Sequence, residues 1–203
     1  MAQGVWVKVF PPPPVVKPEL PGIGGWADIS DTPTSTYTDG KGVKWNVWTF
    51  TADGTINVTT AGLLDMLLVG AGGSIIANSG SGCGGQTALG PHSVPTGAQA
   101  VVVGQPNARS VVGSAESIAA ASSIGGNSTG RSGYGVNGAG SGATAWGGSG
   151  LTSMITGTAL VVSSSGAARN YASEAPVYGG GAFDNGTNTL DPQPGVVIVR
   201  RPA

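Results

Sequence analysis

The chain has 203 residues, of which 37 are glycine; only 9% are charged, and the formal net charge is −1. A typical soluble domain contains about 25% charged residues and about 7% glycine. Each glycine in a helix interior costs about 1 kcal/mol relative to alanine, so this composition argues against a helical protein. The basic residues are few and scattered, which argues against binding to nucleic acid or to an anionic membrane surface.

The counts of reactive side chains also exclude several kinds of site. The chain has one cysteine, Cys83, and one histidine, His92, so it can form neither an internal disulfide nor a Cys/His zinc site. No spacing links His92 to Cys83 and an acid, and we expect no enzymatic activity. Residues 80–85 and 133–138 match the GxGxxG pattern, but glycine and proline follow instead of a helix, so no cofactor is expected. No metal is expected either.

Residues 1–25 are predicted to be an extended, proline-rich attachment arm. Residues 4–10 (GVWVKVF) alternate as a strand does, and the four prolines that follow favour an extended polyproline rod. This strand could pair with the sheet edge of a neighbouring subunit or fold back on its own domain. The residues expected to make the assembly contact are Val5, Trp6, Val7, Val9, Pro11, Pro12, Pro13 and Pro14.

The next segment, residues 26–43, is predicted to be a turn-rich linker. A strand is then expected over residues 44–50, with Trp45 and Val47 on one face and Trp48 and Phe50 on the other. The Asp-Gly sequence in residues 52–54 indicates a hairpin connection to a strand over residues 55–60, in which Ile56 and Val58 are expected to face inward. A more buried strand is expected over residues 63–69, and the close spacing of these three strands predicts a meander. The apolar run over residues 63–69 is too short to span a bilayer, so no membrane insertion is expected.

Glycine, serine, alanine and asparagine dominate residues 70–150, and only residues 98–103 form a good strand pattern there. Further strands are expected over residues 158–163 and 195–200. No segment keeps a 3.6-residue apolar period over three turns, so the fold class is predicted to be all-β. We expect one domain over residues 44–203, a β-sandwich or jelly-roll-like fold with long glycine-rich loops. Alternatively, the glycine-rich stretches pack as extended polyproline-II-like rods, for which glycine recurs closely enough only in patches such as residues 133–150.

Two aromatic residues in the glycine-rich part, Tyr134 and Trp146, are candidates for contact with a glycan or a protein. The competing interpretation is that their rings pack against the glycine backbone. No secretory signal is visible at the start of the sequence, which favours assembly in the cytoplasm.

The order of segments resembles that of the glycine-rich minor tail proteins of tailed bacteriophages, especially those that infect actinobacteria. The resemblance covers residues 25–203. It is carried by ISDTPTSTYTD (29–39), WTFTADGTINVTTAGLLDMLLVGAGG (48–73), SMITGT (153–158), YGGG (178–181) and GVVIVRRP (195–202). The glycine runs are shorter than in that family, which favours a plain sandwich over polyglycine rods. The family has no catalytic residues to carry over.

The resemblance implies a structural virion protein, a minor tail or tail-tip subunit that forms a homo-oligomer through its N-terminal arm. Tail symmetry in the family suggests a trimer or a hexamer, located on the virion and assembled in the host cytoplasm. The implied partners are copies of itself and other tail proteins, with the host cell envelope as a further candidate. Two alternatives remain open: a receptor-binding adhesin that recognises a host cell-surface glycan, and a capsid decoration protein.

Overall fold

A computed structural model describes residues 25–74, 85, 87–106, 109–113, 115–116, 150–163, 178–184 and 189–203. These residues lie in strands, turns and extended segments and include no helix, so the fold is all-β, as predicted. Within the described part, therefore, no helix is long and apolar enough to cross a membrane. The residues expected to mediate assembly or surface contact lie outside the described ranges: Val5, Trp6, Val7, Val9, Pro11–Pro14, Tyr134 and Trp146.

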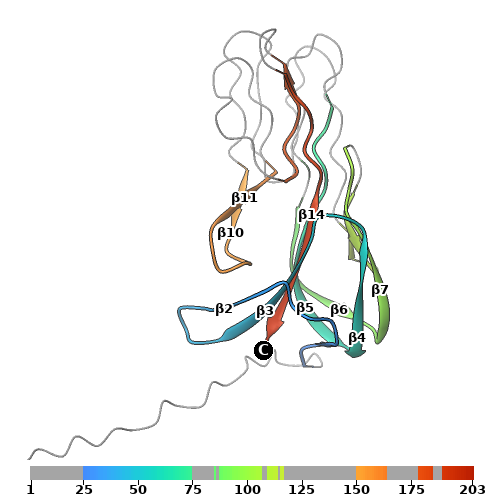
Figure 1. Ribbon diagram of the computed structural model, residues 1–203, viewed down its shortest axis with the longest axis vertical. Helices are drawn as coiled ribbons and strands as arrows, with labels where there is room; N and C mark the ends of the chain where they lie inside the picture. Colours follow the sequence, from blue (N-terminus) through green and yellow to red (C-terminus); the bar gives the residue numbers. More distant parts are fainter. Residues whose placement is uncertain are drawn as a thin grey trace, which may run out of the picture.

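Two five-stranded antiparallel sheets form the body of the protein (Figure 1). Sheet A has the order β2-β3-β14-β5-β6, with bounds Ser35–Thr38, Lys44–Phe50, Val196–Pro202, Gly62–Val69 and Thr87–Val94. Sheet B has the order β1-β4-β7-β8-β9, with bounds Asp28–Ile29, Gly54–Thr60, Gly97–Val102, Val111–Val112 and Ala115–Glu116. Two hairpins join β10 (Leu151–Ser153) to β11 (Leu160–Val162) and β12 (Phe183–Asp184) to β13 (Thr189–Leu190).

The two sheets share one apolar core, which we call the inner core. Sheet A contributes Trp48, Met66 and Val199, among others, and sheet B contributes Ile56 and Val58. Because side chains alternate along a strand, one face of each sheet fills this space. The predicted orientation is therefore confirmed for Trp48 and for the Ile56 and Val58 pair.

A second apolar cluster, the outer core, lies on the other face of sheet A. The hairpin β10–β11 contributes Ile155 and Val162, which pack with buried side chains of β3, β5 and β14 such as Leu67 and Ile198. Sheet A is therefore covered on both faces around its central strands. This explains why β5 and β14 are nearly continuous apolar runs instead of alternating ones.

The predicted meander over residues 44–69 is wrong. β14 lies between β3 and β5, and β4 belongs to sheet B, so residues 51–53 cross between the sheets and do not close a hairpin. The Oδ1 atom of Asp53 fixes this crossing by accepting a hydrogen bond of 2.8 Å from the backbone N–H of Val103. Sequence spacing could not reveal this arrangement, because the strand that separates β3 from β5 comes from the far end of the chain.

The segment predicted to be a linker, residues 26–43, is instead built into both sheets. It contains β1, which pairs with β4, and β2, which pairs with β3. Residues 87–94 form β6, although Gly90 and Pro91 lie in the middle of this segment. Proline is tolerated there because β6 is the edge strand of sheet A. His92 consequently lies in a strand and not in a loop.

Candidate functional site

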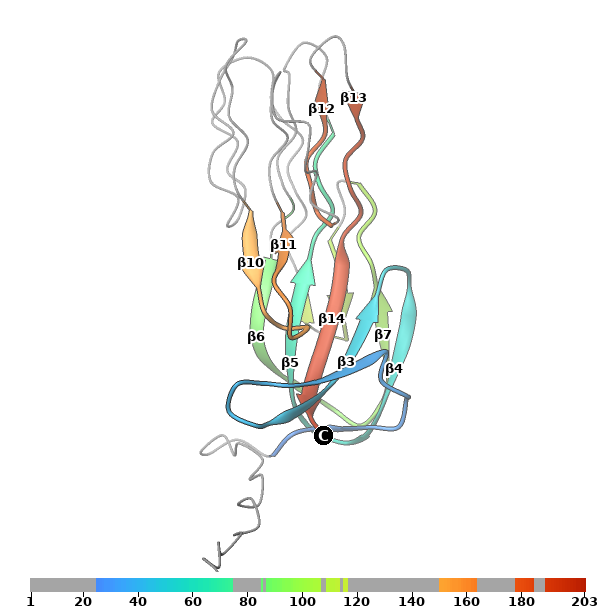
Figure 2. The same ribbon diagram turned by 60° about the vertical axis from the view of Figure 1, so that its left-hand side comes forward.

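The molecule has two chemically different ends. The N–H of Leu63 at the start of β5 donates to the carbonyl oxygen of Gly25 (3.1 Å), and the N–H of Ala203 donates to that of Lys44 at the start of β3 (2.9 Å). The first described residue and the last residue therefore lie at the same end of sheet A, which we call the proximal end. Figure 2 shows β12 and β13 at the opposite, distal end.

Aromatic and charged side chains gather at the proximal end on the outer face of sheet A. The rings of Trp26 and Trp45 meet edge to face, with centroids 5.9 Å apart and an interplanar angle of 88°. The guanidinium carbon of Arg200 lies 4.3 Å from the centroid of the Trp45 ring, a cation–π distance. We call Trp26, Tyr37, Trp45 and Arg200, with the carboxylates of Asp39 and Asp65, the proximal cluster.

Strand pairing brings the charged members of this cluster together. In the register of β14 with β5, Arg200 lies opposite Asp65. Its Nε donates to Asp65 Oδ2 at 2.7 Å, and Nη2 lies 2.7 Å from the same oxygen. The remaining Nη1 donates to the hydroxyl oxygen of Tyr37 in β2. One guanidinium thus links β2, β3, β14 and β5, with its charge compensated by a carboxylate that is only 16% exposed.

Asp39 holds the other side of the cluster. Trp45 Nε1 donates to Asp39 Oδ2 at 3.0 Å, and the backbone N–H groups of Lys41 and Val43 donate to Oδ1. The hydrogen bond from Trp45, followed by those from the backbone, lowers the pKa of Asp39 below its ordinary value. The ionised carboxylate therefore fixes both the turn between β2 and β3 and the orientation of the Trp45 ring.

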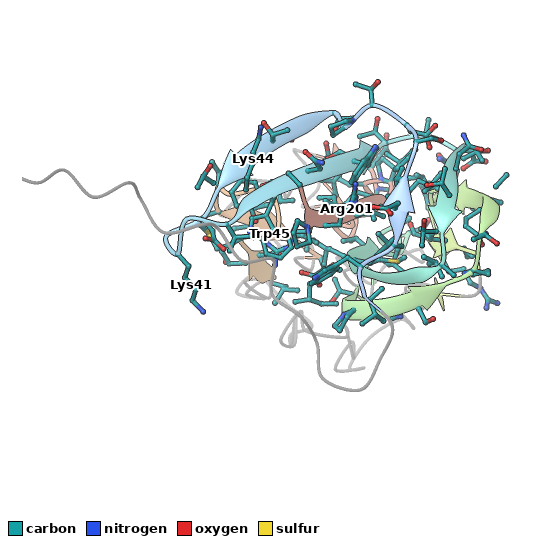
Figure 3. All side chains as sticks on the ribbon, turned by 90° about the horizontal axis from the view of Figure 1, so that it is seen from below. Lys41, Lys44, Trp45 and Arg201 are labelled. Atoms are coloured by element: carbon teal, nitrogen blue, oxygen red, sulfur yellow. The ribbon has the colours of Figure 1, made fainter. Side chains whose placement is uncertain are left out.

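A second ion pair joins the two sheets at the same end. Nη1 of Arg201 in β14 lies 2.9 Å from Oδ1 of Asp28 in β1. Figure 3, a view onto the proximal end, shows Arg201 near the centre and Lys41, Lys44 and Trp45 along the β2–β3 hairpin. The strands that surround Gly25 are thus connected to one another by side-chain pairs as well as by backbone bonds.

Toward the distal end, the described residues include extended segments that belong to neither sheet A nor sheet B. The segment 178–182 makes hydrogen bonds to four separate stretches of chain, whereas a strand in a sheet has neighbours on only two sides. The bonds are Ser163 N to Tyr178 O, Gly85 N to Gly179 O, Gly179 N to Pro194 O and Ala182 N to Gly73 O, all between 2.7 and 3.0 Å. These described residues form a hydrogen-bonded bundle.

Glycine makes this bundle possible, because its segments approach more closely than a Cβ atom would allow. A Cβ on Gly72 would overlap the carbonyl oxygen of Gly180, and a Cβ on Gly195 would overlap that of Val69. Extended glycine-rich segments therefore pack closely at this end of the described chain. The alternative of polyproline-II-like rods stays a prediction. The patch at residues 133–150, on which that alternative was based, lies outside the described residues.

Of the two reactive side chains that the sequence offers, His92 and Cys83, the structure describes only the first. His92 lies in β6, and Cys83 is outside the described ranges. Within those ranges, no three His, Cys, Asp or Glu side chains form a group that could hold a metal ion. The proximal cluster was not predicted from the sequence. Its one available signal was Asp65, a charged residue inside the apolar run of β5, which needs a buried partner.

Comparison with known proteins gives no relative. No family model matches the chain, and no curated protein or solved structure matches it significantly.

Proposed function

We propose that the chain is a structural virion protein, a minor tail or tail-tip subunit that assembles as a homo-oligomer through its N-terminal arm. The observation that carries this proposal is the opposition of the two ends. The described chain starts at the proximal end, where side-chain pairs connect the strands, and the described glycine-rich segment that leads into β12 lies toward the other end (Figure 2). A subunit that is attached to a particle through one of its ends, and that extends its other end outward, needs this arrangement.

The bracing of the proximal end supports a mechanical role. A force applied through the arm reaches the sheets at Gly25, whose carbonyl oxygen accepts a hydrogen bond from β5, and at Trp26, whose ring meets the ring of Trp45 edge to face. Arg200 spreads this load across neighbouring strands, and Arg201 connects the load to sheet B through Asp28. Low overall charge and small side chains suit surfaces that pack repeatedly against copies of themselves.

Electron microscopy of particles tests the proposal. An antiserum raised against the full chain should label purified particles from cultures that express it, and the gold should lie on the tail or its tip. Label on the head would favour a capsid decoration protein. Label confined to host envelopes, or particles that lack the chain in a denaturing gel, would contradict a structural virion role.

A further inference from the structure

Within sheets A and B, four strands have one edge without a described neighbour: β2 and β6 in sheet A, and β1 and β9 in sheet B. Such an edge presents backbone N–H and C=O groups that can pair with another strand. β1 and β9 have two residues each, and β6 contains Pro91, which has no N–H. β2 has four residues, with neither proline nor glycine. The strands of the two hairpins are shorter than β2, with three residues each in β10 and β11 and two each in β12 and β13. Among the described strands, β2 therefore offers the edge best suited to receive a partner.

The register shows which donors of β2 face outward. The pairing with β3 continues into the turn, where the N–H of Asp39 donates to the carbonyl oxygen of Val43 at 2.9 Å. Inward hydrogen bonds recur at every second residue of an antiparallel pair. The N–H of Tyr37 therefore points toward β3, and those of Thr36 and Thr38 point away from it. Both threonines are exposed.

The chain itself contains a segment suited to this edge. Residues 4–10 (GVWVKVF) have the alternating, β-branched pattern of a strand and precede Gly25 by a spacer, residues 11–24, that contains six prolines. In a proline-rich extended form this spacer would reach about 43 Å. A strand added beyond β2 would lie about 19 Å from β5, where Gly25 is bound. A semi-rigid spacer of that length overshoots the edge of its own subunit and suits the edge of a neighbour.

We propose that the outer edge of β2 receives residues 4–10 of a second copy of the chain as an added strand. This proposal deepens the proposed function and rests on its arm-mediated assembly. Each copy then provides one arm and one edge, which are different surfaces. Contacts of this head-to-tail kind generate a ring when the rotation closes. The mode of recognition is β-strand addition, in which main-chain hydrogen bonds supply the affinity.

A substitution on the edge strand tests the backbone pairing. Thr36→Pro removes one outward N–H, and an edge strand tolerates proline at such a position. In sedimentation of the full chain over a concentration series, we expect this variant to raise the dissociation constant of self-association about tenfold, with an unchanged urea midpoint. The matched control Thr36→Val keeps the N–H and should associate as the unsubstituted chain does. Equal association of Thr36→Pro, or an unsubstituted chain that is monomeric throughout, would overturn the proposal.

Disulfide trapping identifies the occupant and is informative even if Thr36→Pro perturbs the fold. All chains in this experiment are full length and carry Cys83→Ser. A chain with Thr36→Cys is mixed in turn with each of a series of chains that have a single cysteine at one of positions 5 to 9. We expect mixed dimers on oxidation, with yields alternating along the series as successive side chains face opposite sides. Gly40→Cys, at an exposed turn, should not cross-link. If a chain with both cysteines closes internally and no mixed dimer forms, the strand pairs with its own subunit and the proposal fails.

These measurements separate this proposal from the proposed function. Labelled tails together with a Thr36→Pro chain that associates normally would retain the virion role and reject the β2 edge. Unlabelled particles together with mixed dimers would reject the virion role and retain the strand exchange.

Discussion

At the scale of single residues, the described structure depends on contacts that only the smallest side chain permits. The N–H of Gly195 donates to the carbonyl oxygen of Gly104 at 2.8 Å, just before β14 begins. A Cβ added there would meet the carbonyl oxygen of Val69 and would lie 2.6 Å from Oγ of Ser110. Ser110 is itself fully buried and donates to the same carbonyl at 2.7 Å. Backbone atoms therefore surround this glycine and have no room to move.

Gly195→Ala is accordingly expected to lower the free energy of unfolding by about 1–3 kcal/mol, the usual cost of overpacking a filled site. The measurement is urea denaturation of the full chain followed by tryptophan fluorescence. Gly40→Ala is the matched control, because an added Cβ there meets nothing within 4 Å. Two variants of equal stability would show that the close contacts at Gly195 are not structurally important.

The carboxylate of Asp39 predicts a pH dependence whose direction follows from its hydrogen bonds. Its pKa is lowered in the folded chain, first by the hydrogen bond from Trp45. Its stabilising contribution is therefore complete above the pKa of unfolded aspartate and is lost as the pH falls through the lower, folded value. We expect Asp39→Asn to be less stable than the unsubstituted chain at neutral pH. The difference should shrink on acidification from about pH 7 to about pH 3, measured by urea denaturation. A difference that is constant across this range would contradict the assignment.

At the scale of elements, β14 organises the molecule. It pairs with β3 on one side and β5 on the other, and its side chains enter both cores. Val197 and Val199 face the inner core, and Ile198 faces the outer core beneath the β10–β11 hairpin. The last strand of the sequence therefore lies between two of the first strands. Sheet A can form only when segments that are distant in the sequence come together, and closing the long loop between them costs conformational entropy.

Coverage of the outer face of sheet A by β10–β11 predicts the cost of truncating Ile198. Ile198→Ala should destabilise the chain by about 2–5 kcal/mol, because a buried isoleucine leaves a cavity when it is shortened. Val161→Ala, at a side chain that is 43% exposed, should change stability by less than about 0.5 kcal/mol. Both values come from urea denaturation. A small loss for Ile198→Ala would mean that the hairpin does not cover this face.

At the scale of the whole molecule, the chain separates attachment from extension. The two sheets form the body, and the described chain starts at the proximal end. The hydrogen-bonded bundle around residues 178–182 lies toward the distal end (Figure 2). Residues between Ala27 and Val199 supply the described side chains of both cores.

Deletion of residues 1–20 is thus expected to leave the cooperative urea transition intact while it removes the chain from particles. The measurement is the amount of chain in purified particles, by quantitative blotting, when the truncated form replaces the full one. A full-length chain with Val102→Ala, an exposed position in β7, is a control for expression level. Normal incorporation of the truncated chain would show that the arm is not the anchor.

Much of the fold could be predicted from particular residues. The excess of glycine and the lack of helical periodicity determine the all-β class. The alternation of Trp48 with its neighbours, and that of Ile56 with Val58, determines which faces of β3 and β4 enter the inner core. These signals are local, because side-chain direction in a strand depends only on the backbone repeat of two residues. β6 was missed because Gly90 and Pro91 disfavour a strand locally, and only its edge position makes them acceptable.

Sequence pattern therefore establishes the all-β class and the approximate positions of β3, β4, β5, β7, β11 and β14, whereas the partners of those strands depend on long-range contacts. Nothing near residues 44–69 indicates that β14 separates β3 from β5, or that Asp65 meets Arg200 across 135 positions of sequence. The proximal cluster and the hydrogen-bonded bundle around residues 178–182 also depend on contacts between segments that are distant in the sequence. Hydrogen-bonding groups repeat identically along every strand, so sequence pattern alone cannot select among possible neighbours. The strand neighbours are selected by the burial of both faces of sheet A, and this burial exists only in the folded protein.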